Sequence, residues 1–345
     1  MMTFQDIAAT PRRLLRWKTL FYDALLPVLS RLGPAASARV LAALGGASAA
    51  LWPPRKAELR RAIATARRSL GADWNEAETT AELAARIPRF LARDFPLDRL
   101  DDRSVFDRFD VAGYAKVQEA IDQGTGVILV GGHFGAHLAA IHWLYRAGTP
   151  LRLLVQRPNH VSQYLHNQFD LDQPIPQSQF FLRRGLGAAE SAERVLNARR
   201  ALRAGMAVYM AGDIPWKSPN ARRGTLMGRT DTFLSVWADL AVLTRAPVVP
   251  VFCSHENRGR FLLTFDPPWT LKPGDEPAAV ERFLARLEAE IDATPADAVA
   301  HLLWSCYQPT FDKSIISIEN RKPIPIQSAN DHVKAAAQTA PIAAQ

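Results

Sequence analysis

Cysteine is almost absent from this 345-residue sequence, which contains only Cys253 and Cys306. Two widely spaced thiols can form neither the disulfide framework of a small secreted domain nor a cysteine-rich metal site. We therefore expect a protein of a reducing, cytoplasmic compartment, with no bound metal and no cofactor.

Acidic residues are scarce in the first seventy positions, which hold 12 Lys or Arg and three acids and so carry a net charge of +9. The rest of the chain has 30 basic and 31 acidic residues, so this segment holds the whole excess. Such an asymmetry indicates an anionic partner, which could be a membrane surface, an acidic carrier or nucleic acid. The alternative is a basic helix face that is only solvated and binds no partner. No nucleic-acid recognition motif follows, which favours the first two.

Long apolar runs are also missing from this segment. Its longest uncharged stretch, Val40–Pro54, is shorter than the roughly 20 residues that a membrane-spanning helix needs. Trp17, Phe21, Tyr22 and Trp52 alternate with basic residues, a pattern typical of helices that lie in a membrane interface. We expect residues 1–70 to be a basic, apolar, helical segment that associates peripherally with a membrane.

The stretch Gly126–Leu138, GVILVGGHFGAHL, is the centre of the remaining sequence. Its β-branched and aliphatic run predicts a strand buried on both faces, as in a parallel sheet, followed by a helix through Tyr145. Further strands are predicted at 151–155, 179–182, 207–211 and 247–253, with an antiparallel edge strand at 261–265. Helices are predicted at 55–70, 77–94, 115–123, 161–169, 188–204, 235–244, 278–291 and 296–307.

Strands that alternate with helices predict an α/β fold, with a mostly parallel central sheet flanked by helices. Residues 96–113 read as an irregular link, and Trp216, Lys217 and Arg222–Gly224 as a loop. We expect this α/β domain to cover residues 71–309. From Thr310 onward the chain has no periodicity and is expected to be a disordered tail.

Polar side chains follow three of the predicted strands: His133, then Arg157 with Asn159, and Asp213. The carboxyl ends of neighbouring parallel strands meet at one crevice, so these groups can form a site there. Histidine is the usual general base near neutral pH, and arginine binds phosphate or carboxylate through paired hydrogen bonds. The alternatives are a helix-capping histidine, a surface arginine and a turn aspartate. His137 lies four residues after His133, but no third ligand completes a metal site.

Several ordered blocks resemble the bacterial late lipid A (lauroyl/myristoyl) acyltransferases of the lysophospholipid and glycerolipid acyltransferase superfamily. The blocks are ILVGGHFGAHLA at 128–139, VQRPN at 155–159, LNARRALRAGMAVYMAGD at 196–213 and GTLMGRTDTFLSVWADLAVLTRAPVVPVF at 224–252. The family's C-terminal element is only faintly echoed, by Pro295 and Trp304.

The resemblance implies transfer of an acyl group from acyl-CoA or acyl carrier protein to a hydroxyl or amine of a lipid or glycolipid, at the cytoplasmic face of the inner membrane. His133 is then the general base, with Arg157 or backbone N–H groups near Gly132 and Gly135 stabilising the oxyanion. The residues expected to bind substrate are Gly132, Phe134, Gly135, Arg157, Asn159, Arg183 and Gly228.

One position departs from the family pattern. The acid expected five residues after His133 is Leu138, which can neither orient an imidazole nor stabilise its charged form. Asp213 is the first candidate to replace this acid. The alternatives are a weakened homologue that binds lipid or acyl chains without catalysis, and an acyl-thioester hydrolase.

Overall fold

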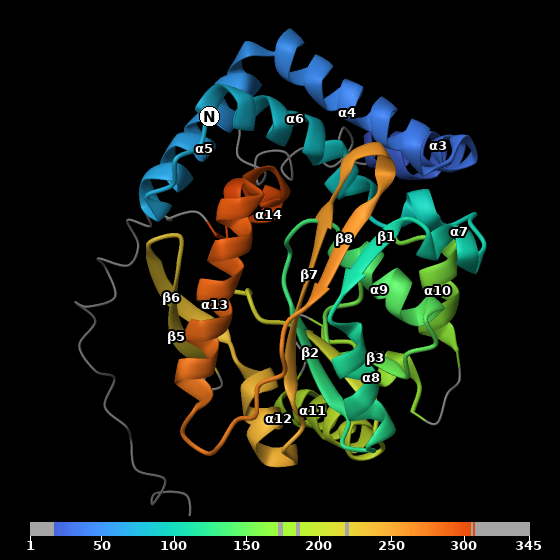
Figure 1. Cartoon of the computed structure of the whole chain (residues 1–345), viewed down its shortest axis with the longest axis vertical. Helices are drawn as coiled ribbons and strands as arrows, with labels where there is room; N and C mark the ends of the chain where they lie inside the picture. The colour runs from blue at the N-terminus through green and yellow to red at the C-terminus, as the bar shows by residue number, and fades with distance from the viewer. Residues whose placement is uncertain (1–16, 172–174, 184–186, 218–220, 305, 308–345) are drawn as a thin grey trace, which may run out of the picture. The chain divides into compact units, whose positions relative to one another are not determined.

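The computed structural model describes residues 17–171, 175–183, 187–217, 221–304 and 306–307. A six-stranded sheet forms its centre, with the strand order β1-β8-β7-β2-β4-β3 (Figure 1). The strands are β1 (Phe109–Ala112), β2 (Val127–Gly131), β3 (Leu151–Leu153), β4 (Ala207–Ala211), β7 (Val248–His255) and β8 (Phe261–Phe265). All neighbouring pairs are parallel except β7 with β8. The predicted α/β class with a mostly parallel sheet is confirmed.

Alternate residues of the central strands enter two separate cores. On β2, Ile128 and Val130 belong to one apolar cluster, whereas Val127 and Leu129 belong to the other. All five residues of β2 are buried, because helices cover both faces of the sheet.

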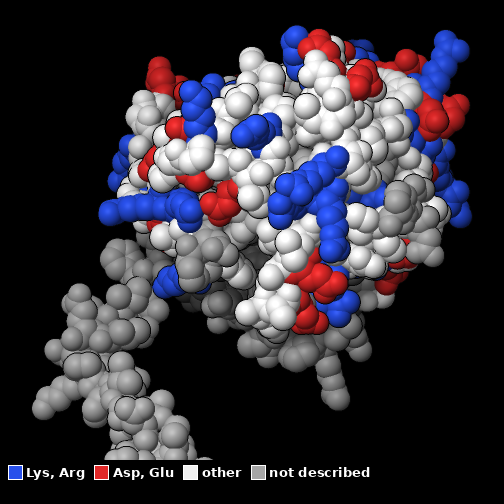
Figure 2. Space-filling model, turned by 90° about the horizontal axis from the view of Figure 1, so that it is seen from below, with Lys and Arg blue, Asp and Glu red and all other residues white. Residues whose placement is uncertain are grey.

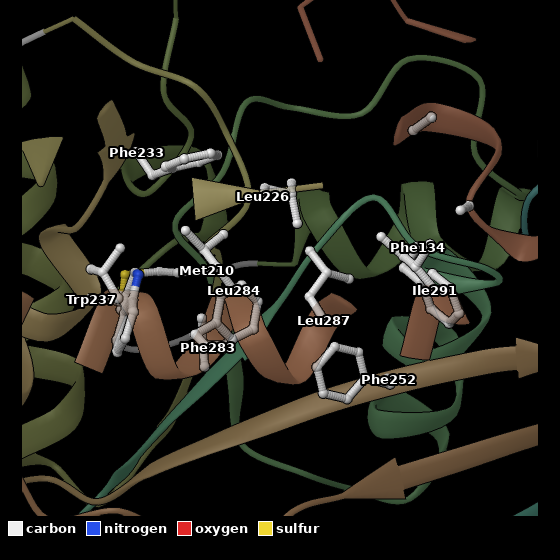
Figure 3. Close-up of a cluster of buried hydrophobic side chains, with 14 of the residues drawn as sticks. Phe134, Met210, Leu226, Phe233, Trp237, Phe252, Phe283, Leu284, Leu287 and Ile291 are labelled. Atoms are coloured by element: carbon white, nitrogen blue, oxygen red, sulfur yellow. The ribbon is translucent and has the colours of Figure 1, made fainter. Parts of the chain in front are cut away.

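The first core lies between the sheet and α11 (Ala188–Arg203), α12 (Val236–Thr244) and α13 (Glu276–Ala293). Phe283, Leu284, Leu287 and Ile291 line the inner side of α13 (Figure 3). The second core lies between the sheet and α8 (Tyr114–Asp122), α9 (His137–Arg146) and α10 (Gln163–Asp170).

The N-terminal region is helical, as predicted. It comprises a π-helical turn (Leu20–Leu25), α3 (Leu26–Leu29), α4 (Pro34–Leu51), α5 (Pro53–Leu70) and α6 (Glu76–Ala92). A Cβ added to Gly45 of α4 would lie 2.0 Å from the carbonyl oxygen of Ala84 on α6, so only glycine permits this close approach. The division expected after residue 70 stays a prediction, although α4 packs on α6 across it (Figure 1).

Among the described helices, none is by itself long and apolar enough to cross a membrane. The pair α4 and α5 passes that test of length and composition when joined, but the two helices are bent by 105°.

Several predicted elements were wrong. The link expected at 96–113 contains 3₁₀ turn Phe95–Leu97, α7 (Asp102–Phe106) and β1. As expected, β8 is antiparallel to β7. It is not an edge strand, however, because β1 pairs with its other side. Instead of a strand at 179–182, there is a 3₁₀ turn (Gln177–Gln179) and one isolated bridge at Leu182.

The expected loop after Asp213 contains a hairpin of β5 (Ala221–Leu226) and β6 (Arg229–Leu234). Met227 and Gly228 both have positive φ, as a two-residue type I′ turn requires. In place of the helix expected at 296–307, the structure has one 3₁₀ turn (Pro295–Asp297) and a short helix, α14 (Val299–Leu303). The remaining 3₁₀ turns are Ser30–Leu32 and Asn257–Gly259, and the tail expected at 310–345 lies outside the described residues.

Candidate active site

His133 lies in the turn between β2 and α9, at the carboxyl end of a central strand. Gly132 precedes it, and a Cβ at that position would lie 2.9 Å from Cγ of Asp213. The glycine therefore lets a carboxylate approach the backbone of the turn closely. This carboxylate comes from the chain segment that directly follows β4, the parallel neighbour of β2.

Asp213 contacts His133 at two points. The backbone N–H of His133 donates a hydrogen bond of 2.7 Å to Oδ2, and the imidazole Nδ1 lies 3.1 Å from Oδ1. The Asp213 side chain is fully buried, whereas 27% of the His133 side chain is exposed. With Nδ1 held by the carboxylate, Nε2 is the ring nitrogen left to meet a substrate.

His301 of α14 and Tyr307, which follows that helix, complete the surroundings of Asp213. Nε2 of His301 lies 2.9 Å from Oδ2, and the Tyr307 hydroxyl donates to the same oxygen at 3.0 Å. The hydroxyl also lies 3.2 Å from Nδ1 of His133. Several partners thus compensate Asp213 for the loss of water on burial. The Trp304 ring packs beside His133, with 5.2 Å between centroids.

The pair has opposite pKa shifts. Burial acts to lower the pKa of His133, but the charge and hydrogen bond of Asp213 outweigh it, so the pKa lies above 6.5. Burial acts to raise the pKa of Asp213, yet His133 and His301 hold it well below its usual value. Asp213 is therefore ionised at neutral pH. Burial and the nearby Asp213 raise the pKa of Tyr307 well above 10, so its phenol keeps its proton.

Leu138, at the position where the resembled family has an acid, is buried in the second core, with 5% of its surface exposed. His137 packs between His133 and Phe90, with ring centroids 5.5 and 5.8 Å away. Burial and the neighbouring His133 lower the pKa of His137 well below 6.5, so this ring is neutral.

A backbone hydrogen bond fixes the turn that follows His133. Gly135 has φ +51° and its N–H donates to the carbonyl of Asp297 at 2.9 Å. This amide, which we expected to be an oxyanion donor, therefore already donates to another residue of the protein. The Phe134 side chain is buried in the first core.

The remaining predicted binding residues are not brought to His133. Arg157 lies two strands away, after β3, and bonds Asp170 and His166 of α10 at 3.2 and 3.4 Å. Asn159 and Arg183 are exposed, and Gly228 occupies the tip of the β5–β6 hairpin beside Ser69.

His301 and Tyr307 were not predicted as site residues from the sequence. Both lie in the last apolar stretch of the chain, and no motif around them indicates a role. Within the described part of the chain, no group of three His, Cys, Asp or Glu side chains is placed to bind a metal ion.

The chain was compared with models of protein families. The model described as "Bacterial lipid A biosynthesis acyltransferase" matches residues 4–300. No curated protein matches the chain.

Proposed function

Because the chain belongs to the bacterial lipid A biosynthesis acyltransferase family, we propose that it moves a fatty acyl group from a thioester donor to a lipid acceptor. The donor is acyl-CoA or acyl carrier protein, and the accepting group is a hydroxyl or an amine. The observation that carries the proposal is the Asp213 carboxylate on Nδ1 of His133, which restores the acid that Leu138 cannot supply.

In this reaction His133 is the general base. Nε2 takes the proton of the acceptor hydroxyl as its oxygen attacks the thioester carbonyl. The tetrahedral intermediate then expels the thiolate, which receives the proton from the imidazolium, so an ester bond replaces the thioester bond. Asp213 keeps the ring in one tautomer and stabilises its charged form.

The developing oxyanion needs a donor. Backbone N–H groups near Gly132, which directly precedes His133, are the donors that we propose. Arg157 is two strands from His133, and its ion pair with Asp170 is between half-exposed side chains, so it contributes little stability. The guanidinium, with the exposed Asn159 and Arg183, is therefore available to bind a more distant part of a substrate.

We place the protein peripherally on the cytoplasmic face of the inner membrane. Large apolar side chains are exposed on the N-terminal helices, among them Leu20 (67%), Leu51 (84%) and Trp52 (64%). On the side away from α4, basic and acidic side chains are intermingled (Figure 2). An apolar surface within the basic segment suits anionic lipid.

The test incubates the purified full-length protein with radiolabelled acyl-CoA or acyl carrier protein and a lipid extract. A labelled lipid that disappears in His133→Ala supports the proposal. Asp110→Asn, a change at an exposed carboxylate on β1, is the control and should keep full activity. Labelled free fatty acid without labelled lipid would instead indicate a thioester hydrolase, and binding without turnover a lipid-binding homologue.

A further inference from the structure

The two oxygens of the Asp213 carboxylate differ in their partners. Oδ2 receives three hydrogen bonds, from the backbone N–H of His133 at 2.7 Å, from Nε2 of His301 at 2.9 Å and from the hydroxyl of Tyr307 at 3.0 Å. Within the described residues, Oδ1 is bonded only by Nδ1 of His133, at 3.1 Å. Three donors on one oxygen fix the rotation of the carboxylate, so that its other oxygen faces the imidazole ring.

His301 is a fully buried residue of α14 whose polar contact is Asp213. An ionised carboxylate only accepts hydrogen bonds, so Nε2 of His301 carries the ring proton and donates it. Nδ1 is buried and has no hydrogen-bond partner in the described part of the chain, which costs free energy. A hydrophobic side chain would fill this space without that cost. The bond to Oδ2 is therefore what distinguishes this histidine from an ordinary core residue.

Tyr307 touches both members of the pair. Its hydroxyl donates its single proton to Oδ2 of Asp213, and the same oxygen lies 3.2 Å from Nδ1 of His133. The hydroxyl oxygen can therefore accept from Nδ1–H, which is then shared between this oxygen and Oδ1 of Asp213. Two acceptors at Nδ1 hold the ring proton there and leave Nε2 to accept a proton from a substrate.

The segment that carries Tyr307 is fixed from several sides. The backbone N–H of Tyr307 donates to the carbonyl of Trp304 at 3.1 Å. Its ring packs against His301 and Trp304, with 4.6 and 6.4 Å between ring centroids. Arg229 of β6 donates to the carbonyl of Cys306 at 3.1 Å. These contacts place the Tyr307 hydroxyl between the carboxylate and the imidazole.

We propose that His301 and Tyr307 are positioning residues of the acyl transfer. They fix the Asp213 carboxylate so that it keeps His133 in the Nδ1–H tautomer, with Nε2 free to accept the substrate proton. Both residues lie after residue 300, where the match with the family model ends. The proposal rests on the proposed function, which it deepens, but the tautomer of His133 exists without turnover and is measured separately.

The first test is ¹⁵N NMR of the full-length protein labelled at histidine, at a pH where the His133 ring is neutral. The His133 signals are those that disappear in His133→Ala. We expect Nδ1 to be the protonated nitrogen in the wild type, and the signals to move toward the Nε2–H form in Tyr307→Phe and in His301→Leu. Tyr145→Phe is the control, because that buried hydroxyl has no partner in the described residues, and should leave the signals unchanged.

Steady-state kinetics with the labelled donor is the second test. Tyr307→Phe should lower kcat about tenfold with little change in KM, because a hydrogen bond to a charged group is lost. In the Asp213→Asn background the same change should have no effect, since the hydroxyl acts through that carboxylate. His301→Gln, whose amide can still donate, should keep more of the wild-type kcat than His301→Leu.

Unchanged His133 signals in both variants would overturn the proposal whatever the activity, and unchanged signals in one of them would remove that residue from it. An equal loss of kcat from Tyr307→Phe with and without the Asp213 carboxylate would also contradict it. If the wild type transfers no acyl group, the proposed function fails while the NMR result still decides this inference. If His301→Leu does not fold, Tyr307→Phe, which removes one oxygen atom from a partly exposed residue, decides it alone.

Discussion

Asp213 holds His133 by two atoms at once, through the backbone N–H at 2.7 Å and through Nδ1 at 3.1 Å. The backbone contact places the turn and the ring contact sets the tautomer. In the mechanism that we propose, the acid of the site therefore comes from the end of a neighbouring strand and not from the helix that follows the histidine.

Replacing Asp213 by Asn should lower kcat about 10²–10⁴-fold with little change in KM, because the carboxylate stabilises a charge that exists only during the reaction. Steady-state kinetics with the labelled donor measures both constants. Asp110→Asn, which alters an exposed carboxylate, is the matched control. A kcat within threefold of the wild type would remove Asp213 from the mechanism.

The residual activity of Asp213→Asn should also show a shifted pH profile. A general base must be neutral, so activity falls as the pH drops through the pKa of His133. Asp213 raises that pKa above 6.5, whereas burial and Arg93 act to lower it. Without the carboxylate, the acid limb of kcat/KM should move to lower pH. A profile with an unmoved acid limb would contradict the assignment.

Leu138→Glu should destabilise the protein rather than add a catalytic acid. Leu138 is 5% exposed within the second core, so a glutamate there buries a carboxylate without a partner. We expect a loss of about 3–5 kcal/mol in the free energy of unfolding, measured by urea denaturation. Leu138→Met, which nearly conserves volume, should cost less than about 1.5 kcal/mol. A stable, more active glutamate variant would show that this position can reach His133.

Gly45 and Gly46 provide a matched pair on α4. A Cβ at Gly45 would overlap the backbone of Ala84, whereas one at Gly46 meets nothing within 4 Å. Gly45→Ala should therefore cost about 1–3 kcal/mol of unfolding free energy. Gly46→Ala should gain roughly 0.5–1 kcal/mol from helix propensity. Equal effects in thermal and urea unfolding would mean that α4 does not pack on α6 as described.

Leu51→Ser combined with Trp52→Ser should weaken flotation with anionic liposomes, by about tenfold in partition coefficient for each side chain. Both side chains are largely exposed at the junction of α4 and α5. Leu243→Ser, at a 56% exposed leucine of α12, is the control and should float like the wild type. If the control loses as much binding as the double variant, the contact surface is not at this junction.

Much of the central sheet could be predicted from local sequence. Val127–Val130 was recognised as a buried strand, and 207–211 and 261–265 were predicted with the bounds that the structure has. Strands covered on both faces are continuously apolar, so their pattern needs no knowledge of the partner strand. The β5–β6 hairpin was missed because its strands carry Arg222, Arg223 and Asp231, and its turn has Met227 before Gly228 instead of Asn or Asp.

By itself the sequence determined that His133 and Asp213 each follow a buried strand, because apolar runs ending in glycine and a polar residue are local signals. Only the tertiary structure decided that β2 lies beside β4, which brings the two side chains together from 80 residues apart. It also decided that His301 and Tyr307 close over Asp213, and that Arg157 pairs with Asp170 instead. Strand order and long-range contacts depend on how whole faces of helices and of the sheet pack together. The packing energy is summed over many residues, so no single position in the sequence indicates it.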